Sequence, residues 1–177
     1  MDEIINLEAE ENKLNETEAN DNPAEIENNY NGKESIIEKV RELNNVKYYF
    51  ALSGNSPENT SEALNAFQQR LLLITGGNDE NMSYDLLGDA LVSKVKHLIL
   101  IGSTSGLIEM SLMRKLIGKH QGIDIRITHC STLRQAVNCA YLSSKPDDSV
   151  LLSPASNCIS ELYDELKEIY IKYVDAL

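Results

Sequence analysis

Short apolar runs alternate with amphipathic stretches along most of this chain. Five of these runs are rich in Val, Ile, Leu or Tyr and are bounded by Gly, Asn, Asp or Pro, at residues 46–52, 71–75, 97–101, 123–128 and 149–152. Such continuous apolar character is typical of strands that are buried on both faces. Because amphipathic stretches separate the runs, the pattern predicts βαβ units in a mostly parallel sheet.

The stretches between the runs have helical spacing. They predict helices near residues 58–69, 83–95, 104–119, 131–144 and 159–176. Ser56 with Pro57, then Ser83, then Ser131 mark three of the starts, since hydroxyl side chains cap helix amino termini and proline fits the first turn. One more helix is predicted at 34–43, an entry element with its apolar side chains on one face: Ile36, Ile37, Val40 and Leu43.

These elements predict one α/β domain over residues 34–177. We expect a three-layer, Rossmann-like fold around a mostly parallel sheet of five or six strands. A chain of 177 residues gives room for one such core and not for two.

Residues 1–33 have a different composition. They carry ten acidic side chains against Lys13 and Lys33, a net charge of −8, which leaves −4 of the total −12 for the rest. A segment so acidic, with few large apolar residues, is predicted to be a disordered tail. The alternative is a tail that docks on a basic partner. Nucleic acid is not an expected partner, because the chain has no cluster of basic residues.

No apolar run approaches the roughly 20 residues that a bilayer span requires. The amino terminus is acidic where a signal peptide would be basic, so we expect a cytoplasmic protein without a membrane span.

The chain has three cysteines, Cys130, Cys139 and Cys158. This odd number is interpreted as buried, reduced thiols. The alternative interpretation is a nucleophilic Cys158 with His120 or His129 as its base. The spacing of these residues and His97 matches no metal site.

Glycines indicate where a ligand would lie. Gly76 and Gly77 follow the second apolar run, and Gly102 and Gly106 follow the third. Ligands of open α/β sheets bind beyond the carboxyl ends of the strands, where helix amino termini favour anions. Glycine in such loops also serves turn geometry alone, and this second reading is preferred. The chain has neither a dinucleotide-binding glycine motif nor a phosphate loop, so no cofactor is expected.

The order of these motifs resembles the carboxy-terminal, third domain of Mur ligases, and most closely that of the members that add D-glutamate. The likeness spans about 130 residues. It rests on the motifs at 46–49, 56–67, 72–79, 95–102, 136–137 and 148–155. It implies the same fold and a relation to peptidoglycan precursor synthesis.

The ligand-binding side chains that this resemblance implies have been replaced. Where the family has Asp-Ser-Lys-Ala-Thr-Asn, Ser53 stands for the lysine and Asn55 for the threonine. Where it has Gly-Gly-Lys-Asp-Lys, Asn78 and Glu80 stand for the two lysines. Only Ser-Pro-Ala, at residues 153–155, is kept of the last motif, and it is interpreted as turn geometry. By position, the candidate ligand-binding residues are Ser53, Asn55, Gly76, Gly77, Asn78, Ser153 and Cys158; no catalytic or metal-binding residue is assigned.

These losses, and the acidic residues in place of a central ATP-binding domain, lead us to expect no autonomous ligase activity. The favoured hypothesis is a non-catalytic binding or interaction module around the synthesis of UDP-N-acetylmuramoyl-peptides. Its partner would be another cell-wall protein. The alternative is the third-domain component of a split, ATP-dependent D-glutamate ligase, acting in trans with a separate ATP-binding domain. A weaker alternative is an unrelated anion site at the loops containing Gly76–Gly77 and Gly102–Gly106.

Overall fold

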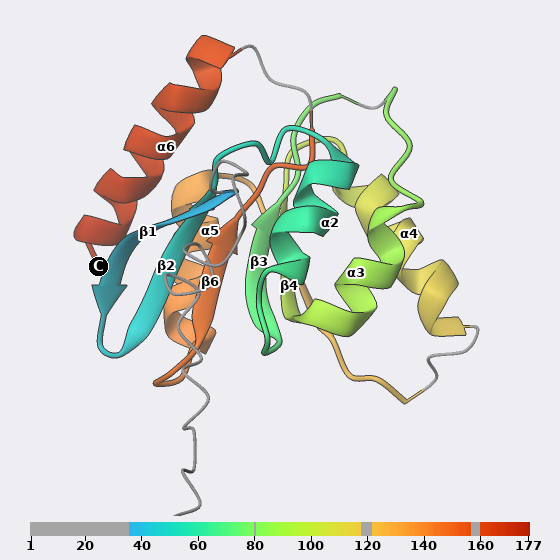
Figure 1. Ribbon diagram of the computed structural model, residues 1–177, viewed down its shortest axis with the longest axis horizontal. Coiled ribbons are helices and arrows are strands. Elements are labelled where there is room, and N and C mark those ends of the chain that lie inside the picture. The colour runs from blue at the N-terminus through green and yellow to red at the C-terminus, as the bar shows by residue number, and fades with distance from the viewer. Residues whose placement is uncertain (1–35, 80, 118–121, 157–159) are drawn as a thin grey trace, which may run out of the picture.

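A computed structural model describes residues 36–79, 81–117, 122–156 and 160–177. Within these residues, six strands form one sheet in the order β1-β2-β6-β3-β4-β5 (Figure 1). The strands are β1 (Ile37–Leu43), β2 (Val46–Ala51), β3 (Leu71–Thr75), β4 (Val95–Ile101), β5 (Arg126–Cys130) and β6 (Ser149–Leu152). Neighbouring strands from β2 to β5 are parallel, and β1 pairs antiparallel with β2.

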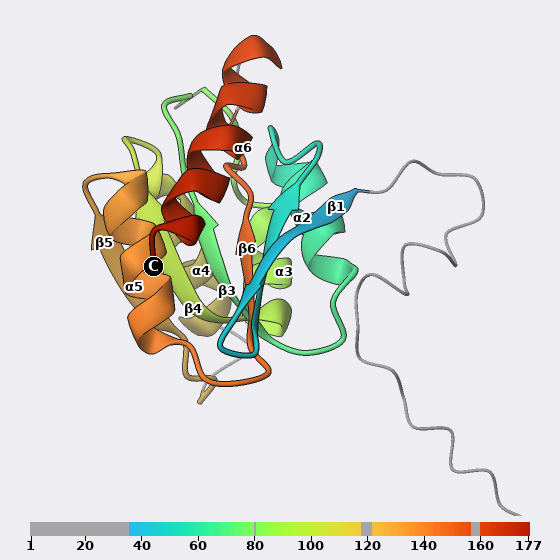
Figure 2. The same ribbon diagram turned by 90° about the vertical axis from the view of Figure 1, so that its left-hand side faces the viewer.

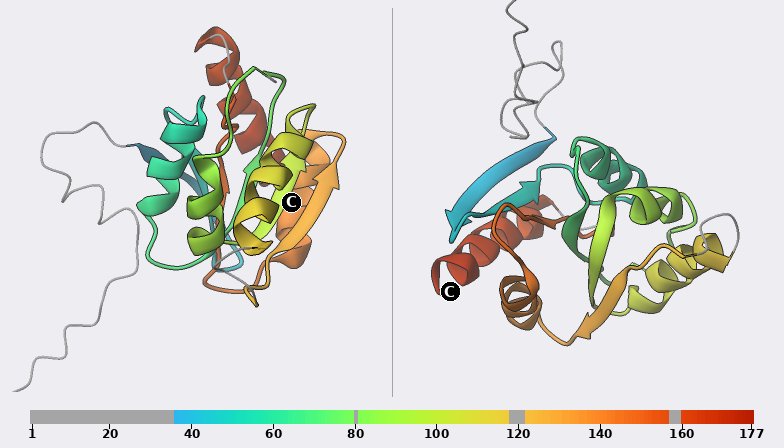
Figure 3. Two further views of the ribbon diagram at one scale, coloured as in Figure 1. Left: turned by 90° about the vertical axis from the view of Figure 1, so that its right-hand side faces the viewer. Right: turned by 90° about the horizontal axis from the view of Figure 1, so that it is seen from below.

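Helices cover both faces of this sheet (Figures 2 and 3). They are α2 (Pro57–Asn65), α3 (Leu87–Lys94), α4 (Ser105–Ile117), α5 (Leu133–Ser143) and α6 (Ser160–Asp175). The first three share one buried cluster with the sheet, and α5 and α6 share another on the opposite face. Every residue of β3 is buried, as its unbroken apolar sequence requires. The predicted three-layer, mostly parallel α/β fold is thereby confirmed.

The helix predicted at 34–43 is wrong, because β1 occupies this segment. Its apolar residues do not share one face: Ile37 packs with the α2–α4 cluster, whereas Val40 and Leu43 pack against the α5–α6 cluster. Asn44 and Asn45 both have positive φ, of 52° and 62°, and turn β1 directly into β2. This two-residue Asn-Asn turn is the sequence signal that favours a hairpin over a helix.

Two of the three predicted helix starts need correction. Ser56 does cap α2, since its hydroxyl accepts from the Asn59 N–H at 3.1 Å. By contrast, α3 begins after Leu86, three residues later than Ser83 predicts and without a side-chain cap. The cap of α5 is Thr132 and not Ser131; the hydroxyl of Thr132 accepts from Gln135 N–H at 3.2 Å.

The fifth apolar run and the cysteines also differ in detail from the predictions. The strand expected at 123–128 is shifted to Arg126–Cys130, and Ile123 and Ile125 pack partly buried ahead of it. Cys130 and Cys139 are free, as predicted, but only half-buried. The predicted tail, Cys158 and His120 lie outside the described residues. No helix in the described residues combines the length and the apolar character that a membrane span requires.

His97 is a buried polar residue of β4, 5% exposed. The hydroxyl of Ser143 donates to the Cys139 carbonyl at 2.6 Å, so its oxygen accepts from Nδ1–H of His97 at 3.0 Å. This leaves Nε2 to accept from the Thr128 hydroxyl at 2.9 Å. Burial, and secondarily the charge of Arg126, lowers the pKa of His97 from 6.5 to about 4. His97 is therefore a neutral histidine with both ring nitrogens hydrogen-bonded.

The lowered pKa of His97 predicts acid sensitivity of the fold. The unfolded chain binds a proton near pH 6.5 and the folded chain only near pH 4, so stability is full above pH 6.5 and falls as the pH drops toward 4. Between pH 7.5 and 4.5 we expect this residue to account for a loss of about 2–3 kcal/mol in the free energy of unfolding. Denaturant unfolding at the two pH values measures it. His97→Gln, which does not titrate, should lose less by that amount; equal losses in both proteins would contradict the assignment.

Candidate functional site

The candidate site lies at the carboxyl-terminal edge of the sheet, where three loops meet. They follow β2 (residues 52–56), β3 (residues 76–79) and β6 (residues 153–156). Because β6 lies between β2 and β3, these loops are neighbours although they are far apart in sequence. They hold all the predicted ligand-binding residues except Cys158, which is not described. We call these three loops the carboxyl-edge crevice, after the place at which open α/β sheets bind their ligands.

The loop after β2 is tied to the rest of the protein at Gly54. Its N–H donates to the Tyr163 hydroxyl at 2.7 Å, and that hydroxyl donates to the Ala51 carbonyl. The Gly54 carbonyl accepts from the Ala155 N–H at 2.8 Å. A Cβ at this glycine would lie 2.2 Å from the Ser153 Oγ, so no side chain fits. On either side of it, Ser53 is exposed and Asn55 is half-buried.

Ser153 is fully buried, and its hydroxyl has a partner inside the protein. Its Oγ lies 2.7 Å from the Thr60 Oγ1 of α2. The next residues bend sharply, and Ala155 has a φ of +55°, a left-handed conformation that costs an ordinary residue about 1–2 kcal/mol. The Ser-Pro-Ala motif thus forms a tight turn that places Ser153 against α2.

The loop after β3 is also held by hydrogen bonds to other parts of the protein. The Gly77 N–H donates to the Thr104 hydroxyl oxygen at 2.8 Å, and the Gly77 carbonyl accepts from the Thr104 N–H at 3.1 Å. Gly76, with a φ of +118°, donates its N–H to the Pro154 carbonyl at 2.9 Å. A Cβ there would meet the Ile101 carbonyl oxygen at 2.0 Å. Gly76 is needed for this close approach of backbones, whereas a Cβ at Gly77 would meet the Ser156 side chain at 2.5 Å.

Asn78 and Asp79 complete the loop after β3. Asn78 is exposed. Asp79 donates its N–H to the Ser156 Oγ at 3.1 Å and accepts at its carbonyl from the Tyr84 hydroxyl at 2.8 Å. Its carboxylate accepts from the Asn81 N–H at 3.1 Å. Glu80 lies outside the described residues.

The crevice is neutral to acidic. In the described residues of its three loops, Asp79 carries the only formal charge. Two cations from other elements, Lys115 and Arg134, do not replace the lost lysines. Lys115 is near the far end of α4 and pairs with Asp89 at 2.7 Å, whereas Arg134 is exposed in the first turn of α5, beyond β5. Neither belongs to the three loops.

The structure brings the predicted residues of the three loops to one edge of the sheet, but the residues that contact these loops were not predicted. Thr60, Thr104 and Tyr163 come from helices or from the start of one, and bond to loops as far as 109 residues away in the chain. Local patterns do not carry such pairings, so no sequence signal would have revealed them. The structure therefore adds that the crevice is closed by the protein's own hydroxyl and amide groups.

A mostly parallel sheet with a glycine loop after β3 and a Ser-Pro-Ala turn after β6 defines a Rossmann-like α/β domain. The family model described as "Mur ligase, glutamate ligase domain" matches residues 37–156. The chain belongs to the Mur ligase family, through its C-terminal glutamate ligase domain.

Individual relatives agree with this assignment. UDP-N-acetylmuramoylalanine–D-glutamate ligase of Ruminiclostridium cellulolyticum is 41% identical over 133 residues, which are 75% of this chain and 29% of that enzyme. The enzyme of the same name from Acetivibrio thermocellus is 42% identical over 127 residues, 72% of this chain and 27% of the relative. The chain thus spans less than a third of the length of these relatives.

A solved structure shows the shared fold. The murein peptide ligase of Psychrobacter arcticus matches with a TM-score of 0.51 at 12% sequence identity, over 79% of this chain and 30% of that chain.

Two tyrosines of α6 offer a matched test of the crevice contacts. Both rings pack on Phe50, at centroid distances of 5.1 Å for Tyr163 and 6.4 Å for Tyr170. The Tyr170 hydroxyl is buried without a hydrogen-bond partner among the described residues. Tyr163→Phe should lower the free energy of unfolding by about 1–3 kcal/mol, because it removes the hydroxyl that bridges the Gly54 N–H and the Ala51 carbonyl and leaves these two groups only their long 3.4 Å bond to each other.

Tyr170→Phe removes an unpaired polar group and should leave stability unchanged or raise it by up to about 1 kcal/mol. Chemical denaturation of both variants measures the contrast. Equal effects of the two substitutions would show that the Tyr163 bridge does not hold the loop.

Proposed function

We propose that this chain is a non-catalytic binding or interaction module of the Mur ligase type, related to the synthesis of UDP-N-acetylmuramoyl-peptides. One observation carries the proposal. The crevice in which the family resemblance places the ligand is occupied by internal hydrogen bonds, and its described loops contain no cation.

The ligands that the family resemblance implies carry carboxylate or phosphate groups. A lysine that binds a carboxylate or phosphate oxygen through a charge-assisted hydrogen bond contributes about 1.5–3 kcal/mol. Ser53 and Asn78 offer neutral groups at the positions of two such lysines. An acyl phosphate or an incoming D-glutamate would lose this stabilisation.

The internal contacts add to this loss. Ser153 would have to break its contact with Thr60 in order to bind a ligand. The Gly77 amide would likewise have to leave Thr104. Each exchange offsets part of the free energy of any new hydrogen bond, since the partner is left buried and unpaired. A binding role that uses other surfaces of the domain meets neither cost.

The alternative is a third-domain component that completes a D-glutamate ligase in trans. The glycine loop after β3 and the Ser-Pro-Ala turn favour it, because both keep residues of the family motifs. A separate ATP-binding domain would then be the partner. The cytoplasmic location expected from the sequence stays a prediction under either proposal.

Calorimetric titration tests the module directly. D-glutamate, ATP and a UDP-N-acetylmuramoyl-peptide should each show no saturable heat with the full chain, because the crevice has no free cation to bind them. The D-glutamate ligase of Ruminiclostridium cellulolyticum, measured alongside, is the positive control. A dissociation constant in the micromolar range for any of these ligands would overturn the non-catalytic proposal.

The trans-acting alternative has its own assay. An amino-terminal fragment of a D-glutamate ligase, without its third domain, is mixed with this chain, and phosphate release is followed with all substrates present. We expect the rate of the mixture to equal that of the fragment alone. A gain that disappears in Gly76→Ala, where the new Cβ meets the Ile101 carbonyl, would favour the split enzyme instead.

A further inference from the structure

A second concave region lies at the opposite, amino-terminal edge of the sheet. One depression of about 310 Å³ opens where β4 and β5 begin and α5 ends, lined by Lys96, His97, Arg126, Ser143, Lys145 and Asp148. A second, of about 460 Å³, shares three of these residues and continues along α5 past Thr128, Asn138 and Leu142. We call the two together the amino-edge groove.

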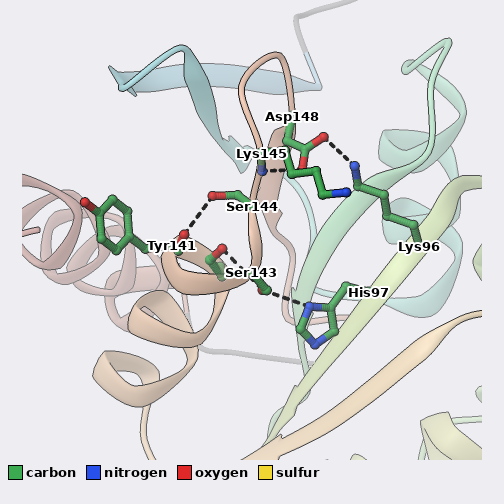
Figure 4. Close-up of polar contacts among 8 residues, drawn as sticks. Lys96, His97, Tyr141, Ser143, Ser144, Lys145 and Asp148 are labelled. Carbon is green, nitrogen blue, oxygen red and sulfur yellow. Dashed lines mark hydrogen bonds and ion pairs between the residues drawn. The ribbon is translucent and has the colours of Figure 1, made fainter.

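Positive charge gathers at the first depression. Three cations and two carboxylates, Asp124 and Asp148, line it, so its formal charge is +1 in a chain of net charge −12. Asp148 is already committed, because it pairs with the Lys96 ammonium and accepts from the Lys145 N–H at 2.8 Å. Figure 4 shows Lys96, Lys145 and Asp148 gathered beside the His97 ring.

Two of the cations are available to a ligand. The side chains of Arg126 and Lys145 are exposed and form no ion pair within the described residues. Arg126 is opposite His97 in the β4–β5 register, and its charge acts on the imidazole. Because His97 is buried and neutral, it adds no charge to the lining of the depression beside the cations.

The end of α5 points at this groove, and a bare helix carboxyl terminus would repel an anion. Here three hydrogen bonds reach carbonyls near this end, those of residues 139–141 (Figure 4). Ser143 Oγ donates to the Cys139 carbonyl at 2.6 Å, Ser144 Oγ to the Tyr141 carbonyl at 2.9 Å, and Ser144 N–H to the Ala140 carbonyl at 2.9 Å. These bonds reduce the partial negative charge that faces the groove.

The second depression has a different character. Leu142 is 81% exposed, an apolar side chain open to solvent beside the hydroxyl of Thr128 and the amide of Asn138. Apolar and neutral polar groups together suit the uncharged body of a small molecule.

We propose that the amino-edge groove binds an elongated small molecule. Its anionic head, a phosphate or a carboxylate, contacts Arg126 and Lys145, and its uncharged body lies along α5 over Leu142. This site lies at the far edge of the sheet from the carboxyl-edge crevice, and the inference does not rest on the function proposed above.

The test uses the full chain and two probes with the same body, phenyl phosphate and benzoate, with inorganic phosphate as the head group alone. Amide and imidazole NMR signals are followed during each titration. We expect saturable shifts confined to the strand starts of β4 and β5 and to residues 142–148. The probe with the lower dissociation constant identifies the head group as phosphate or carboxylate.

Variants separate the two halves of the groove. Arg126→Gln with Lys145→Gln should weaken binding of the preferred probe at least tenfold, whereas Lys172→Gln, an exposed cation of α6 outside the groove, should leave it unchanged. Leu142→Ser should reduce only the advantage of phenyl phosphate over inorganic phosphate. All four sites are exposed, so these proteins are expected to fold.

Three results would overturn the proposal. The first is the absence of saturation with every probe. The second is binding that persists in the double variant. The third is a loss in Lys172→Gln as large as in the double variant, which would indicate a general effect of charge.

Discussion

The insertion of β6 between β2 and β3 is the constraint on which the rest of this structure depends. Its backbone bonds to β2 on one side and to β3 on the other, so the sheet is continuous only when residues 149–152 are in place. The same insertion brings three distant loops together at the carboxyl edge. There Gly76 meets the Ile101 carbonyl so closely that only a hydrogen fits, and a Cβ at Gly54 or Gly77 would meet the side chain of Ser153 or Ser156. The fold and the crevice therefore both depend on the non-local pairing of β6 with its two neighbours.

The sequence allowed the strands and helices to be predicted because most of them carry a strong periodic signal. The apolar runs of β3 and β6 match their predicted ranges, since such buried strands exclude polar residues. The helix predicted at 34–43 was wrong because its four apolar residues at helical spacing also suit an edge strand with a bulge after Lys39. There the Asn44–Asn45 turn and pairing with β2 determine the structure. Tertiary pairing overrides local propensity at such edges.

The candidate site was only partly accessible to the same reasoning. Glycine and Ser-Pro-Ala motifs locate the crevice, because loop geometry depends on nearby residues. The closing contacts of Thr60 and Tyr163 do not follow from any local pattern, since each joins a helix to a loop that is distant in the chain. The amino-edge groove was not predicted at all. Its cations Lys96, Arg126 and Lys145 are scattered singly along the sequence, and only the parallel sheet brings them to one edge.

The antiparallel direction of β1 decides where the chain enters the domain. Ile36 accepts from the Leu52 N–H at 2.9 Å, and Ile37 lies opposite Ala51, so the polypeptide arrives beside the crevice. Helix α6 runs back toward the other edge, and Leu177 follows its end (Figure 1). A fluorophore attached at Ile36 is thus held on the crevice side, and one attached at Leu177 on the side of the groove. These two positions provide separate reporters for events at opposite ends of one sheet.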